Sequence, residues 1–86
     1  MELKEQFEQA ATDSKNLSEK PNNEILLQLY SLYKQGSIGD VNTEPPFNPF
    51  DFVNKAKYEA WASLKGKSTT DAMTEYIELV KKLKAN

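Results

Sequence analysis

The chain has 86 residues, a hydrophobic fraction of 38% and a formal net charge of −2. This length fits one domain with a single compact core, spanning residues 1–86. All 11 basic residues are lysines, against 13 acidic residues, and a chain with this balance lacks the basic field that general nucleic-acid binding requires. The absence of cysteine excludes a disulfide framework and a thiolate zinc site.

Signals for membrane targeting and for catalysis are also missing. The N-terminal stretch MELKE is too charged for a signal peptide, and no apolar run approaches the roughly 20 residues of a membrane helix. We therefore expect a cytoplasmic protein. Without histidine and cysteine, the commonest general base and the thiol nucleophile are lacking, so an enzyme is disfavoured. No catalytic residue, metal site or cofactor is expected.

Four segments show the spacing of three and four residues between apolar side chains that indicates amphipathic helices. The spacing predicts helices over residues 3–15, 23–36 and 52–65, and a fourth from residue 69 toward the C-terminus. No strand pattern competes with them. The expected fold is therefore all-α, a four-helix bundle with one long ordered crossover between the second and third helices.

Local signals mark the ends of these helices. Asn22 or Asn23 and then Asp51 can cap the second and third helices, because their side chains accept a free backbone N–H. A weak capping box at residues 68–71 begins the fourth helix. Gly36 and Gly66 are placed to end the second and third helices in the left-handed conformation.

The crossover at residues 36–50 contains three prolines and two glycines, which exclude a regular helix. Its apolar residues suggest that it is pinned to the core; they are Ile38, Val41, Phe47 and Phe50. The third helix is expected to point six side chains inward, those of Phe52, Val53, Ala56, Ala60, Trp61 and Leu64.

Four motifs follow one another along the chain. They are LYSLYKQ at residues 29–35, GDVNTE at 39–44, KAKYEAW at 55–61 and DAMTEYI at 71–77. Each motif alone would be weak evidence, but the ordered set resembles the acyl-CoA-binding protein family over the whole length of the chain.

The resemblance implies a monomeric four-helix bundle of up-down-down-up topology that carries and buffers long-chain acyl-CoA without catalysis. It also implies transient contact with acyl-CoA-using enzymes or membranes. By position in the motifs, Tyr30, Lys34 and Lys57 would hold the ribose 3′-phosphate, and Tyr33 would stack on adenine. The remaining positions implied are head-group contacts at Lys15 and Tyr76 and acyl-groove residues at Leu26 and Leu27.

Two features of the chain depart from the family pattern. The family usually has Arg-Pro-Gly after its NTE segment, whereas this chain has Pro45-Pro46-Phe47 and is one residue longer before Asp51. Tyr58 stands where the family commonly has tryptophan. Both departures fall in the crossover or at the start of the third helix, where they could alter the preferred acyl length.

Each candidate residue also has an ordinary structural explanation. Lys15 and Lys34 lie at helix C-terminal ends, where any cation gains about 0.3–1 kcal/mol from the helix dipole. Tyrosines at helical spacing are more often core residues than ligand platforms, and a leucine pair can be plain bundle packing. Two other functions stay open: a module that docks a partner helix on the apolar face of the second helix, and a small carboxylate-based thioesterase.

Overall fold

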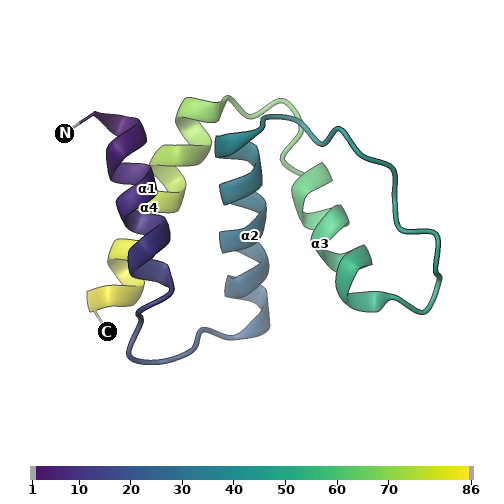
Figure 1. Ribbon diagram of the computed structural model, residues 1–86, viewed down its shortest axis with the longest axis horizontal. Coiled ribbons are helices and arrows are strands. Elements are labelled where there is room, and N and C mark those ends of the chain that lie inside the picture. Colours follow the sequence, from purple (N-terminus) through teal and green to yellow (C-terminus); the bar gives the residue numbers. More distant parts are fainter. Residues whose placement is uncertain (1, 86) are drawn as a thin grey trace.

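The computed structural model describes residues 2–85. It contains α1 (Leu3–Ser14), α2 (Asn23–Ser37), α3 (Phe52–Ala62) and α4 (Thr69–Ala85). Helix α1 runs in one direction, α2 and α3 run in the opposite direction, and α4 returns, as Figure 1 shows. The prediction of an all-α, up-down-down-up bundle with one long crossover is confirmed.

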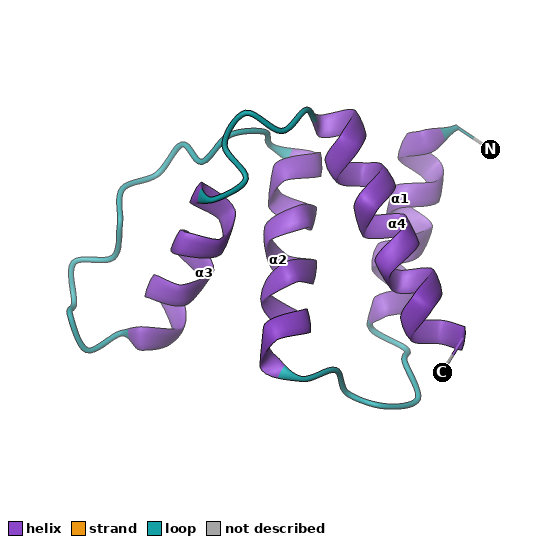
Figure 2. Ribbon diagram, turned by 180° about the vertical axis from the view of Figure 1, so that it is seen from behind, coloured by secondary structure: helices purple, strands orange, loops and turns teal. Residues whose placement is uncertain are grey.

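The molecule is flat, with principal extents of 40 × 28 × 15 Å. Helix α4 packs against both α1 and α2, whereas α3 packs against α2 (Figure 2). The long crossover runs beside α3 and brings the chain back to the end where α2 began, so that α2 and α3 are parallel neighbours. No helix between residues 2 and 85 has the length and apolar character needed to span a bilayer.

The predicted caps form with side-chain to backbone hydrogen bonds. The Asn22 side chain accepts the N–H of Ile25 at 2.9 Å, which settles the choice between the two asparagines. The backbone N–H of Asp71 donates to the Ser68 hydroxyl at 3.0 Å and so forms one half of the expected capping box. At the start of α3, the Asp51 carboxylate accepts a backbone N–H at 3.3 Å.

Gly66 has the predicted left-handed conformation, but α3 ends earlier than predicted, at Ala62 with Ser63 as its C-cap, and the prediction for Gly36 is wrong. Gly66 has a φ of 94°, in the left-handed region beyond the end of α3. Gly36 instead lies inside α2, which continues to Ser37, and it is buried. A Cβ atom at Gly36 would lie 3.0 Å from Cζ of Phe7, so the missing side chain serves the close approach of α1 to α2.

The core lies between α1, α2 and α4. Phe7 of α1, Leu29 and Leu32 of α2, and Tyr76 of α4 are among its buried members. Phe7 and Tyr76 pack edge to face, with ring centroids 5.2 Å apart. Helix α3 supplies no buried member of this cluster, although Leu64, just beyond it, packs against the cluster from the outside.

The expectation that the crossover and the start of α3 point inward is wrong at several positions. Phe47 and Phe50 are 93% and 79% exposed, and Phe52 and Val53 are 70% and 65% exposed. Ile38 is also exposed, whereas Val41 is half-buried. Because the main packing partner of α3 is α2, the first turn of α3 and the crossover beside it lie away from the core between α1, α2 and α4.

This difference in burial leads to a stability prediction. Leu32→Ala should lower the free energy of unfolding by about 2–5 kcal/mol, because it removes buried contacts between α2 and the core. Phe47→Ala removes a larger side chain but should change the free energy by less than about 0.5 kcal/mol, because that ring is exposed. Urea unfolding of both variants checks this, and a large loss with Phe47→Ala would show that the crossover is packed in solution.

Candidate functional site

Tyr30 is the centre of the candidate site. The ammonium nitrogen of Lys34, one turn further along α2, lies 5.8 Å from the centroid of the Tyr30 ring. The ammonium nitrogen of Lys57, on α3, lies 5.5 Å from the same centroid. Both distances fall within the range of a cation–π contact. The aromatic ring therefore brings lysines from two helices to one place.

Lys34 has a second aromatic neighbour. Its ammonium nitrogen lies 5.6 Å from the ring centroid of Trp61, which is 4% exposed. The indole N–H of Trp61 donates to the carbonyl oxygen of Gly39 at 2.9 Å, which fixes the ring. Trp61 thus connects α3 to the start of the crossover and lies buried beside the ammonium group of Lys34.

The two lysines bring positive charge without a carboxylate to balance it. Within residues 2–85, the salt bridges join Lys67 to Glu75 and Lys84 to Asp13, and neither includes Lys34 or Lys57. Like charges near one ring repel each other, and an anion placed between them would turn this repulsion into attraction. Lysine binds phosphate as a point charge, so the pair is suited to a phosphate group.

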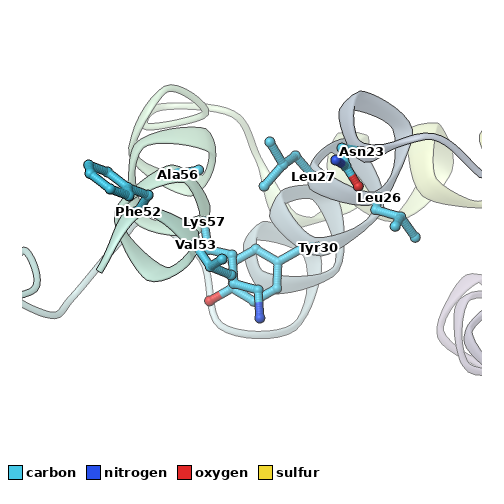
Figure 3. A pocket seen from close by; sticks show the side chains of 8 residues that line it. All are labelled: Asn23, Leu26, Leu27, Tyr30, Phe52, Val53, Ala56 and Lys57. Atoms are coloured by element: carbon cyan, nitrogen blue, oxygen red, sulfur yellow. The ribbon is translucent and has the colours of Figure 1, made fainter. Parts of the chain in front are cut away.

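An apolar groove of about 410 Å³ begins at Tyr30 and separates α2 from α3. Figure 3 shows Tyr30 projecting from α2 toward Val53 and Lys57 of α3. The residues lining the groove are mostly apolar; they are Asn23, Leu26, Leu27, Tyr30, Phe52, Val53, Ala56 and Lys57. The groove lies where the N-terminal halves of both helices face each other. Apolar surface that stays open to solvent is typical of a binding site.

A second hollow of about 280 Å³ lies on the other side of Tyr30. It is formed by α1, α2, α4 and the residue after α1, through Ala11, Ser14, Lys15, Leu29, Tyr30, Tyr33 and Tyr76. Tyr30 lines both hollows, so a ligand could occupy them together. Lys15 is exposed at the rim and directly follows the last residue of α1.

Tyr33 presents an open aromatic surface in the second hollow. One face of its ring stacks on Phe7, at a centroid distance of 5.2 Å and an interplanar angle of 20°. The residue is nevertheless 40% exposed. A ring held from behind and open in front can receive a second flat group without losing much conformational freedom.

Tyr76 lies deeper, with 3% of its surface exposed. Its hydroxyl donates to the Ser14 hydroxyl at 3.1 Å. Burial raises the pKa of the Tyr76 hydroxyl above its usual value, and the hydrogen bond to Ser14 opposes this to a lesser extent. The phenol therefore stays neutral in neutral solution and belongs to the core as well as to the floor of the hollow.

The structure gathers the residues proposed from the sequence into one continuous region. Lys15, Tyr30, Tyr33 and Tyr76 line one hollow, and Leu26, Leu27, Tyr30 and Lys57 line the other. Lys34 completes the region through its contact with Tyr30. The leucine pair lines the groove and does not join the buried core cluster, so the groove explanation is favoured for both leucines over plain bundle packing.

Sequence reasoning missed the α3 side of the groove. Val53 and Ala56 were assigned to the core, although they line the groove beside Lys57. Ala56 and Lys57 lie three and four residues after Val53, which places both on the helix face of Val53, and this was the available signal. Asn23 also lines the groove, although the sequence suggested only a capping role for it. No group of three or more metal-binding side chains gathers within residues 2–85.

Comparison with known proteins identifies the family. The family model described as Acyl CoA binding protein matches residues 4–80 of the chain. The chain belongs to the acyl-CoA-binding protein family. An acyl-CoA-binding protein of Brassica napus is 48% identical over 83 residues, covering 96% of this chain and 89% of that protein. The one from Ricinus communis is also 48% identical over 83 residues, with coverages of 96% and 91%.

Solved structures of the family have the same fold. The crystal structure of Oryza sativa acyl-CoA-binding protein 2 superposes with a TM-score of 0.89 at 41% identity, covering 95% of this chain and 90% of that chain. The solution structure of the yeast acyl coenzyme A binding protein gives a TM-score of 0.74 at 47% identity, with coverages of 92% and 91%. The roles of individual site residues stay predictions.

Proposed function

We propose that this protein binds long-chain fatty acyl-CoA esters and serves as a carrier and buffer of the acyl-CoA pool, without catalysis. One observation carries the proposal: an apolar groove meets two lysine ammonium groups at Tyr30, and neither lysine has a carboxylate partner within residues 2–85. An acyl-CoA ester joins a phosphate-rich head to a hydrocarbon chain, so it matches both halves of this surface.

The proposed roles follow from the chemistry of each part of the ligand. Tyr30, Lys34 and Lys57 would hold the 3′-phosphate, and the open face of Tyr33 would stack on adenine. Lys15 and Tyr76 would contact the rest of the head group from the second hollow. The acyl chain would lie in the groove along Leu26 and Leu27, where each buried methylene gains about 0.8 kcal/mol.

Several features support a carrier over an enzyme. The relatives with these identities are named as binding proteins, and the family is one of binding proteins. The cysteine-free composition supports a cytoplasmic location, and we propose a monomer that contacts acyl-CoA-using enzymes or membranes transiently.

A module that docks a partner helix on α2 is less well supported. That proposal required an unoccupied apolar face, but α4 packs on one side of α2 and α3 on another. Leu29 and Leu32 are buried in the core, and Leu26 and Leu27 are half-buried in the groove.

A ladder of acyl-CoA lengths tests the proposed function directly. Calorimetric titration with chains of about 8 to 20 carbons should show affinity rising roughly tenfold for each two methylenes, followed by a plateau when the groove is full. Free CoA and free palmitate should each bind much more weakly than palmitoyl-CoA. Absence of binding by all three ligands would refute the proposal, and release of free CoA thiol on prolonged incubation would indicate a thioesterase.

Lys34 should discriminate between ligands with and without the 3′-phosphate. Lys34→Ala should weaken palmitoyl-CoA binding by about 1.5–3 kcal/mol, or about ten- to a hundredfold, because a charged hydrogen bond is lost. Binding of the 3′-dephospho analogue should change far less. Lys55→Ala is the matched control, since Lys55 is an exposed lysine of α3 outside the groove lining. Equal losses with both ligands would place Lys34 away from the 3′-phosphate.

Tyr33 should act through its ring. Tyr33→Ala should cost about 1–3 kcal/mol of binding free energy if the ring stacks on adenine. Tyr33→Phe keeps the ring and the stack on Phe7, and should bind nearly as tightly as the unaltered protein. Calorimetry on both variants, with circular dichroism to confirm folding, measures this. A folded Tyr33→Ala variant with unchanged affinity would make Tyr33 a structural residue.

A further inference from the structure

The placement of α3 poses a physical problem. It packs against α2 alone among the helices with extensive contacts, and its first turn exposes Phe52 and Val53. The preceding crossover exposes Phe47 and Phe50, so it does not anchor the helix through the core. Yet one wall of the groove and Lys57 both belong to α3. The packing of α3 on α2 and the buried Trp61 hold part of the distance between the two helices, and hydrogen bonds close to Trp61 add to them.

A hydrogen-bonded clasp joins the three segments that meet at the C-terminal ends of α2 and α3. One carboxylate oxygen of Asp40, at the start of the crossover, accepts the side-chain N–H of Gln35 at 2.9 Å. The same oxygen accepts the backbone N–H of Gly66, in the turn after α3, at 2.9 Å. Asp40 thus connects the last turn of α2 to the segment that leaves α3.

Gln35 makes this clasp rigid. Its side chain is completely buried, and its amide nitrogen also donates to the backbone carbonyl of Lys67 at 2.8 Å. The two N–H groups of that nitrogen are therefore matched by two acceptors, which fixes the orientation of the amide. The Oε1 atom of the same amide is buried without a hydrogen-bond partner among residues 2–85, so the amide is held by its two N–H contacts alone. Losing either acceptor would leave a second polar group of Gln35 buried and unpaired.

The clasp is coupled to the binding surface through the residue next to Asp40. The carbonyl of Gly39 accepts the indole N–H of Trp61, and the ring of Trp61 lies below the ammonium of Lys34. Gly39 has a φ of 105°, a conformation suited to glycine that turns the chain sharply before Asp40. A shift of Asp40 would therefore move Trp61, then α3, and with it Lys57 and the groove wall.

The charge of Asp40 is compatible with this role. The hydrogen bond from the backbone N–H of Gly66, and secondly the one from the Gln35 side chain, lower the pKa of the Asp40 carboxyl below its usual value. Lys65, which follows the end of α3, adds a smaller favourable attraction. The group is therefore ionised throughout neutral solution and remains an acceptor for both donors.

We infer that Asp40 is a positioning residue, which fixes the spacing of α2 and α3 and thereby sets both the width of the acyl groove and the approach of Lys57 to Lys34. It touches no part of the proposed ligand itself. The inference rests on the proposed function as far as its effect on binding is concerned, whereas the clasp can be tested on the free protein.

The first test uses hydrogen exchange without ligand. Asp40→Ala should raise the exchange rates of the α3 amides and of the Trp61 indole, while the α1 and α4 amides keep their protection, because the core between those helices does not include Asp40. Asp40→Asn keeps an oxygen acceptor in the same place and should restore most of the protection. Glu44→Ala is the control; it removes the same charge from an exposed crossover residue. Uniform loss of protection in all four helices would overturn the inference.

The second test separates positioning from a general loss of folded protein. Asp40→Ala should weaken palmitoyl-CoA binding by about tenfold and reduce the gain in affinity per methylene, since the α3 wall of the groove is displaced. If the substitution only reduced the fraction of folded protein, the apparent affinity would fall by the same factor for every acyl length. The gain in affinity per methylene would then be unchanged. Unchanged affinity and slope in a folded Asp40→Ala variant would also overturn the inference. Failure of the unaltered protein to bind would refute the proposed function, and the exchange experiment would still decide the clasp.

Discussion

The packing of α2 on both of its sides is the constraint on which the rest of the structure depends. One side of this helix places Leu29 and Leu32 in the core shared with α1 and α4, and the other places Leu26, Leu27 and Tyr30 in the groove beside α3. A helix that must satisfy two neighbours needs an unusually broad apolar surface. The apolar residues of α2 are therefore divided between the core and the groove.

The candidate site is formed by residues of both α2 and α3, which meet at the ring of Tyr30. Ammonium groups from the two helices lie 5.8 and 5.5 Å from the centroid of the Tyr30 ring, whose electron-rich π-system attracts both cations. Phe7 has a comparable role behind Tyr33, because the stack between them lets a core residue support a partly exposed ring. At Tyr30 and at Phe7, an aromatic side chain joins the packed interior to the solvent-exposed part of the site.

Residues of the crossover can be substituted without disturbing the core of this protein. The segment in which Pro45, Pro46 and Phe47 depart from the family pattern is also the one that exposes the largest apolar side chains. Exposed side chains contribute little to the free energy of unfolding, so substitutions there leave the core undisturbed. The segment runs beside α3, and its changes can therefore affect the groove while the core of α1, α2 and α4 stays the same.

The sequence by itself determined the four helices, their order and the caps at Asp51 and Ser68, because these depend on local spacing and local hydrogen bonds. For the second helix it narrowed the cap to Asn22 or Asn23. It also indicated the family, through four motifs in order, and so the set of residues to examine.

Tertiary structure alone decided which face meets which neighbour. Helical spacing shows that Val53 and Ala56 share a face with Lys57, but not that this face borders an open groove instead of the core. Likewise, Gly36 reads as a helix end until Phe7 of a different helix is found in the space of its missing Cβ. The contacts of Asp40 with Gln35 and Gly66 join residues up to 26 positions apart, which no local pattern can reveal. The physical reason is the same in each case: periodicity fixes the direction of a side chain, whereas its burial depends on what the rest of the chain places opposite to it.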